Sequence, residues 1–166
     1  MRSFWLYGAL CVAIQGLSGC GSNPVAETKT EVTHGTKVAQ YDRLVVAFGD
    51  SLYAGYRLAP GEGLAPQLQA ALQAAGIKAR VHNAGVSGDT TAAGKARLAF
   101  VLDNLERKPD LVVLGLGGND MLRGIKPSET KANMTTMMDE LKRRGIPVVL
   151  TGMLASPNMG QDYGKS

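Results

Sequence analysis

The stretch LVVAFGDSL at residues 44–52 joins an apolar run to a polar turn that contains a serine. A short, continuous apolar run is typical of a strand that is buried on both faces of a parallel sheet. The glycine and aspartate that follow favour a sharp turn at the carboxyl end of that strand, with the Ser51 hydroxyl at the edge of the sheet. A serine in this place is either an ordinary turn residue or the nucleophile of a hydrolase.

Strands and helices alternate along the rest of the sequence. The apolar pattern predicts strands at 43–48, 77–81, 110–116 and 146–151, and helices at 64–75, 90–108 and 129–144. This alternation predicts an α/β domain whose parallel sheet is covered by helices on both faces. A chain of 166 residues with 45% apolar content suits one such domain.

Two of the predicted helices carry more detailed expectations. The helix at 90–108 is predicted to stop before Pro109 and to be amphipathic, with one face made of Ala93, Ala96, Arg97, Phe100, Val101, Asn104 and Leu105. The helix at 129–144 is predicted to begin after an N-cap at Ser128. Its core-filling face is predicted to hold Met134, Met137, Met138 and Leu141.

Three polar turns follow three of the predicted strands: GDS at 49–51, NAGVSGDT at 83–90 and GGND at 117–120. The ends of parallel strands meet at one edge of the sheet, so we expect these turns to lie together. Ser51 can supply a nucleophilic hydroxyl, while the N–H groups of Ser51 and Gly88 and the amide of Asn119 can face a developing oxyanion. The simpler alternatives are a tight turn at Gly88 and an Asx-turn at Asn119. Asp89 or Thr90 is then only a helix N-cap.

The three turns together resemble the sequence blocks of the SGNH (GDSL) hydrolases. Residues 49–56, GDSLYAGY, are similar to the first block, residues 83–90 to the second and residues 117–120 to the third. The chain resembles the bacterial esterase group of that family, which includes acyl-CoA thioesterase/lysophospholipases and arylesterases. The resemblance implies a flavodoxin-like three-layer αβα sandwich with a parallel sheet.

The resemblance also implies roles for particular residues. Ser51 is then the catalytic nucleophile, Asp50 a supporting residue, and Ser51, Gly88 and Asn119 the donors of the oxyanion hole. The implied substrate is a small-molecule acyl ester or thioester. The family needs no metal or other cofactor.

The family completes its site with an Asp-x-x-His pair near the C-terminus, and this sequence contains no such pair. Its two histidines are His34, in a polar segment, and His82, which we expect to pack or to form a hydrogen bond in a strand. The catalytic Asp and His are therefore not present in this chain, and we expect the last strand and helix of the domain to be missing. Two interpretations stay open: an incomplete, inactive part of a longer esterase, and a base-less protein that binds acyl groups or lipids without turnover.

The first residues predict export. Residues 1–19 combine an early arginine with a short apolar segment, as in a signal peptide, and LSGC at 17–20 resembles the bacterial lipoprotein box. We expect lipidation of Cys20, a flexible tether at 20–40 and the hydrolase domain at 41–166. A plain signal peptide cut near Gly19 is the alternative. With lipidation, the protein is a membrane-anchored, periplasm-facing lipoprotein, and loss of Cys11 with the signal leaves the domain no free thiol.

The composition argues against other partners. The formal net charge is +4, and the longest basic run, KRR at 142–144, directly precedes a glycine, as at the end of a helix. We therefore expect no nucleic-acid partner. The glycine-rich turns lack the spacing of nucleotide-binding loops. We expect a monomer.

Overall fold

The computed structural model describes residues 40–153. The predicted signal peptide, Cys20, His34 and all of the predicted tether except Gln40 lie outside the described residues, as does the segment after Met153. Among the residues that are described, no helix is long and apolar enough to cross a membrane.

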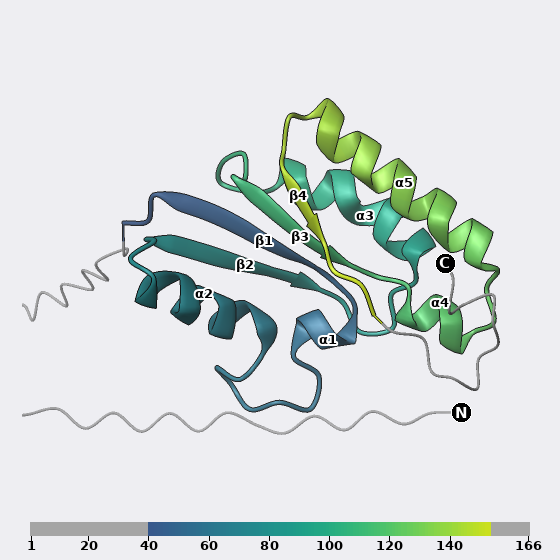
Figure 1. The fold of residues 1–166 in the computed structure, drawn as a ribbon, viewed down its shortest axis with the longest axis horizontal. Helices are drawn as coiled ribbons and strands as arrows, with labels where there is room; N and C mark the ends of the chain where they lie inside the picture. The colour runs from purple at the N-terminus through teal and green to yellow at the C-terminus, as the bar shows by residue number, and fades with distance from the viewer. Residues whose placement is uncertain (1–39, 154–166) are drawn as a thin grey trace, which may run out of the picture. The chain divides into compact units, whose positions relative to one another are not determined.

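The sheet contains four parallel strands in the order β2-β1-β3-β4 (Figure 1). They are β1 (Arg43–Gly49), β2 (Ala79–Gly85), β3 (Leu111–Gly115) and β4 (Val148–Leu150). This order confirms the predicted flavodoxin-like sheet. The direction of winding reverses between β1 and β3, and ligands of such sheets bind outside the carboxyl ends of the strands at this switch point.

Helices cover the sheet on both faces, which confirms the three-layer arrangement (Figure 1). One face carries α1 (Ser51–Ala54) and α2 (Leu64–Ala74), and the other carries α3 (Thr91–Asp103) and α5 (Pro127–Arg143). The short helix α4 (Gly118–Leu122) follows β3. Side chains of β1 alternate between the faces: Val46 and Phe48 pack towards α3 and α5, whereas Ala47 packs with Tyr53 and Ala65.

The structure corrects part of the predicted face of the helix after the second turn: Val101 and Leu105 pack against the core, but Ala93, Ala96 and Phe100 are exposed. Helix α3 ends at Asp103, five residues before the predicted end at 108, and it buries Thr91, Gly94, Leu98 and Leu102. Phe100, on the predicted face, is 70% exposed. The alanines of the helix, at 92, 93, 96 and 99, are all exposed, so they mark the solvent side rather than the buried side. Gly94 decides the orientation, because a Cβ there would lie 2.3 Å from the Leu116 side chain.

Other boundaries also differ from the predictions, most of all the end of the second strand and the start of α5. Strand β2 runs to Gly85 rather than ending at Val81, so the second turn begins inside the sheet. Helix α5 begins at Pro127 with Lys126 at the N-cap position, which places Ser128 inside the helix. Proline fits the first helical position because its fixed φ suits the helix and it has no N–H to satisfy. The expected core contribution of Met134, Met137 and Leu141 is confirmed, and Met138 is partly buried against the same core.

The first three strands all end in glycine. Gly49 pairs with Gly85 on one side and with Gly115 on the other. A Cβ on Gly85 would lie 2.2 Å from the backbone nitrogen of Ala54, and a Cβ on Gly115 would lie 2.3 Å from the Tyr53 hydroxyl. Helix α1 therefore rests directly on the carboxyl ends of three neighbouring strands, and side chains at these positions would displace it.

We expect Gly85→Ala to destabilise the protein by about 1–3 kcal/mol, because the new methyl group meets rigid backbone rather than a movable side chain. Gly152→Ala is the matched control: nothing lies within 4 Å of that position, and its φ is not positive. Urea unfolding of the two variants measures the difference. Equal midpoints for the two would show that α1 does not depend on the glycine contact.

Candidate active site

Ser51 is the first residue of α1, directly after the end of β1. The buried carboxylate of Asp50 caps this helix and accepts a hydrogen bond of 3.0 Å from the N–H of Leu52. The helix ends after one turn at Gly55, whose φ of 78° lets its N–H donate back to the Ser51 carbonyl. This tight turn holds the Ser51 side chain, which is half-buried, at the carboxyl edge of the sheet.

The second turn is bound to the end of β1. The N–H of Val86 donates to the Gly49 carbonyl at 3.0 Å, and the N–H of Asp89 donates to the Val86 carbonyl at 3.2 Å. Gly88 has a φ of 87°, which a residue with a side chain rarely adopts. Thr90 is the N-cap of α3. The structure therefore contains both the tight turn at Gly88 and the helix cap at Thr90. Neither of them uses the N–H of Gly88 as a hydrogen-bond donor.

Asn119 lies in the first turn of α4 and reaches across to the second turn. Its side-chain nitrogen Nδ2 donates to the Asp89 carbonyl at 2.9 Å. The side chain therefore joins two turns instead of forming a local Asx-turn. An amide nitrogen carries two hydrogens, and this bond uses only one of them. No other group in residues 40–153 accepts the second hydrogen, so it is available to a ligand.

The three turns of the predicted site therefore lie together at the switch point between β1 and β3. The first and third turns also meet, because a Cβ on Gly118 would lie 3.4 Å from Asp50 Oδ2. Within residues 40–153, neither the N–H of Ser51 nor that of Gly88 donates a hydrogen bond to another described group. These N–H groups and the Asn119 amide give one hydrogen-bond donor on each turn. An oxyanion hole is built from donors of this kind.

A buried carboxylate anchors the third turn from behind. Asp120 is fully buried and accepts hydrogen bonds from the N–H and hydroxyl of Thr91, at 2.8 and 2.5 Å, and from Thr130 at 3.1 Å. Asn133 donates to the same Thr91 hydroxyl at 3.2 Å. A carboxylate out of contact with water needs such donors. The network joins α3, α4 and α5 next to Asn119.

A small cavity of about 160 Å³ opens beside the first turn, with Asp50, Leu52 and Tyr53 in its lining. The Tyr53 hydroxyl lies 2.6 Å from the Thr151 hydroxyl. Burial raises the pKa of Tyr53, so its phenol stays protonated at neutral pH. Tyr53 therefore binds α1 to the segment after β4 as a neutral group.

His82 does not lie at this edge of the sheet. It pairs with Val46 and precedes Gly85 by three residues, which places it about 10 Å back along the strand. No cluster of three or more histidine, cysteine, aspartate or glutamate side chains suited to a metal ion occurs in the described part of the chain.

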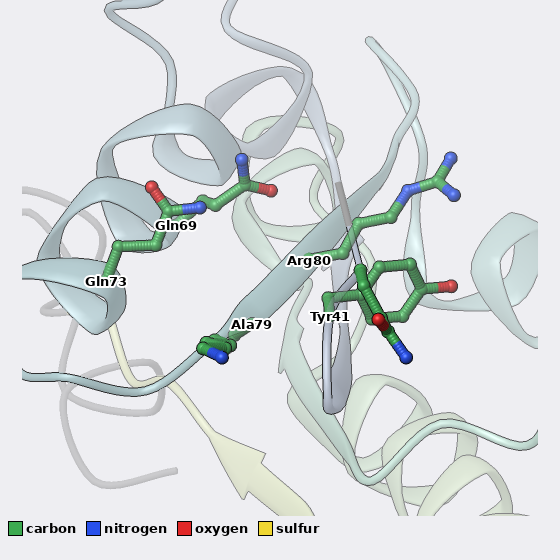
Figure 2. Close-up of a pocket in the computed structure, with 7 residues that line it drawn as sticks. Tyr41, Gln69, Gln73, Ala79 and Arg80 are labelled. Atoms are coloured by element: carbon green, nitrogen blue, oxygen red, sulfur yellow. The ribbon is translucent and has the colours of Figure 1, made fainter. Parts of the chain in front are cut away.

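A larger cavity, of about 420 Å³, lies at the opposite ends of β1 and β2 (Figure 2). Gln69 and Gln73 of α2 line one side of it, and Tyr41 and Arg80 line the other. The Gln69 side chain accepts a bond of 2.9 Å from the N–H of Val81, and Arg80 pairs with Glu106 at 2.8 Å. These side chains already bond within the protein, and the cavity lies at the edge of the sheet opposite to Ser51.

Arg97 is a residue of this site that the sequence analysis placed on the apolar face of a helix. Its Nε atom donates to Asp89 at 2.6 Å, and its terminal nitrogen donates to the Gly49 carbonyl at 3.1 Å. The sequence signal that could have identified Arg97 as a site residue was its charge, which stood out within a predicted apolar face. Its partners, however, are known only from the folded structure.

Comparison with known proteins gives consistent matches. The model of the GDSL-like Lipase/Acylhydrolase family matches residues 47–166. Esterase TesA of Pseudomonas aeruginosa is 41% identical over 128 residues, which cover 77% of this chain and 62% of that protein. An arylesterase of Vibrio mimicus is 38% identical over 125 residues, covering 75% of this chain and 62% of the relative. The chain thus spans about three fifths of the length of these relatives.

A solved structure supports the same assignment. The crystal structure of AlinE4, described as an SGNH-hydrolase family esterase, superimposes with a TM-score of 0.73 at 52% sequence identity. The match covers 76% of this chain and 67% of that protein. On the sequence match over residues 47–166 and the shared fold, the chain belongs to the GDSL-like lipase/acylhydrolase family, the SGNH hydrolases.

Proposed function

We propose that the natural protein is a serine esterase or thioesterase that hydrolyses small-molecule acyl esters through an acyl-enzyme on Ser51. The observation that carries this proposal is the meeting of three turns at the switch point, with Ser51 and donors from Gly88 and Asn119. The printed names of the relatives, esterase and arylesterase, support the same class of reaction.

In the proposed reaction, the Ser51 hydroxyl oxygen attacks the acyl carbonyl carbon, and the hydroxyl proton passes to a general base. The negative charge on the carbonyl oxygen is stabilised by the N–H groups of Ser51 and Gly88 and by the Asn119 amide. Collapse of this intermediate expels the alcohol or thiol, which takes the proton from the base. Water then attacks the acyl-serine in the same way and releases the carboxylic acid.

Among residues 40–153, no histidine lies at this site to act as the general base. The 166 residues hold no Asp-x-x-His pair, and His82 lies back along β2. We propose that the base comes from residues outside this sequence, in the part of the relatives' length that the chain does not span. The 166 residues alone are then expected to react slowly, because a serine hydroxyl is a weak nucleophile without a base.

We expect a fluorophosphonate probe to label the natural gene product at Ser51, because the activated hydroxyl attacks phosphorus as it attacks a carbonyl. Ser51→Ala is expected to remove the label. Ser128→Ala, on the exposed start of α5, serves as the control and is expected to keep it. Labelling is read by mass spectrometry of the tryptic peptides. A natural protein that binds acyl ligands but takes no label would support the base-less alternative instead.

We expect Asn119→Ala in the natural protein to lower kcat by roughly a hundredfold or more, since losing one oxyanion donor costs about 3 kcal/mol of barrier. KM is expected to change much less, because the donor acts mainly on the transition state. Asn104→Ala, at the C-cap of α3, is the control for loss of an amide elsewhere. A kcat equal to that of the wild type would remove Asn119 from the proposed oxyanion hole.

We also propose that the protein is an exported lipoprotein anchored through Cys20. The proposal is supported by LSGC at 17–20 behind a short apolar segment. In a bacterial host fed radiolabelled palmitate, Cys20→Ser is expected to lose the lipid label and leave the membrane fraction. Cys11→Ser is expected to retain both. Label and membrane association that persist in Cys20→Ser would contradict the anchor.

A further inference from the structure

Arg97 makes three contacts from the middle of α3. Its Nε donates to Asp89 Oδ2 at 2.6 Å, its terminal nitrogen donates to the Gly49 carbonyl at 3.1 Å, and its guanidinium lies 4.0 Å from the centre of the Phe48 ring. The Arg97 side chain is only 20% exposed and that of Asp89 only 11%. The pair is therefore shielded from solvent, unlike a surface ion pair whose charges water screens.

Arg97 contacts two turns of the site directly, and the third turn is bonded to one of its partners, Asp89. Gly49 precedes the nucleophile by two residues, so the bond to its carbonyl holds the start of the first turn. Asp89 directly follows Gly88, so the ion pair holds the second turn. The Asp89 carbonyl accepts the bond from Asn119, which connects the third turn to the same residue.

We propose that Arg97 is a positioning residue that sets the distances between Ser51, Gly88 and Asn119 in the oxyanion hole. This inference rests on the proposed hydrolase function. Arg97 touches no reacting atom in this scheme and acts through the Gly49 carbonyl and the Asp89 carboxylate. Small shifts of such donors weaken the stabilisation of the transition state more than the binding of substrate.

Arginine suits this position for a geometric reason. Its planar guanidinium presents Nε and a terminal nitrogen in fixed directions, so one rigid group bonds a carboxylate and a carbonyl on different turns. The planar group also stacks over the Phe48 ring, which is fully buried at the end of β1. A lysine keeps the positive charge but offers a single nitrogen on a flexible stem, so it cannot reproduce this bridge.

The test is the steady-state kinetics of Arg97→Lys in the natural protein, with a chromogenic short-chain aryl ester as substrate. We expect kcat to fall by roughly tenfold to a hundredfold, the size of effect seen when reacting groups are misplaced by about 1 Å. KM is expected to change by less than about threefold, because the substrate-binding surface is unchanged. The rate of labelling of Ser51 by the fluorophosphonate probe is expected to fall in parallel with kcat.

Arg144→Lys is the matched control. The Arg144 side chain is 22% exposed and pairs with Glu140 at 2.6 Å and with Asp103 at 2.5 Å. It lies at the C-cap of α5, at the other end of the sheet from Ser51. Both substitutions remove a bridging guanidinium of similar burial, so both are expected to lower the thermal midpoint. Only Arg97→Lys is expected to lower kcat.

A double-mutant cycle with Asp89→Asn tests the route of the effect. Because Arg97 acts through Asp89, the kcat loss in the double variant is expected to be clearly smaller than the product of the two single losses. Arg97→Lys with wild-type kcat, or losses that multiply, would overturn the positioning role. A wild-type protein with neither turnover nor labelling would instead overturn the proposed hydrolase function on which the role rests.

Discussion

The contact between helix α1 and the carboxyl ends of three strands is the constraint on which the site depends. Gly49, Gly85 and Gly115 are paired in register, and the space where their side chains would stand is filled by α1 and Tyr53. Because the helix rests on the backbone of β1, β2 and β3, the sheet itself fixes its height above the strand ends. Ser51, at the start of α1, is therefore positioned by the ends of the central strands.

Polar contacts between the turns hold the parts of the site that the contact between α1 and the strand-end glycines does not position. Turns in isolation are mobile, because few buried apolar groups hold them. Here Arg97 connects the Gly49 carbonyl with the Asp89 carboxylate, and Asn119 connects the third turn with the second. Asp120 holds the third turn from behind through Thr91 and Thr130. Each buried charge has partners, so the polar cluster adds rigidity without leaving a charge unpaired.

Much of this arrangement was predictable from local sequence patterns. The apolar runs predicted the strands that became β1 and β3, and the glycine-rich turns predicted which segments meet at the sheet edge. The weaker predictions failed where local signals compete. The alanines of α3 lie on its exposed side, so apolar composition indicated the wrong face and did not show that Gly94 faces the core. Ser128 is a good N-cap residue, but Pro127 fits the first helical position and moved the start of α5.

The sequence by itself determined the order of strands and helices and the three polar turns, because these follow from interactions between residues close along the chain. The tertiary structure alone decided which face of α3 is buried and what Arg97 binds. Asp89 lies 8 residues from Arg97 and Gly49 lies 48 residues away. A local sequence pattern therefore does not predict that Arg97 bonds to either of them. They come together because the parallel strands end at one edge and the crossover helices bring distant segments there.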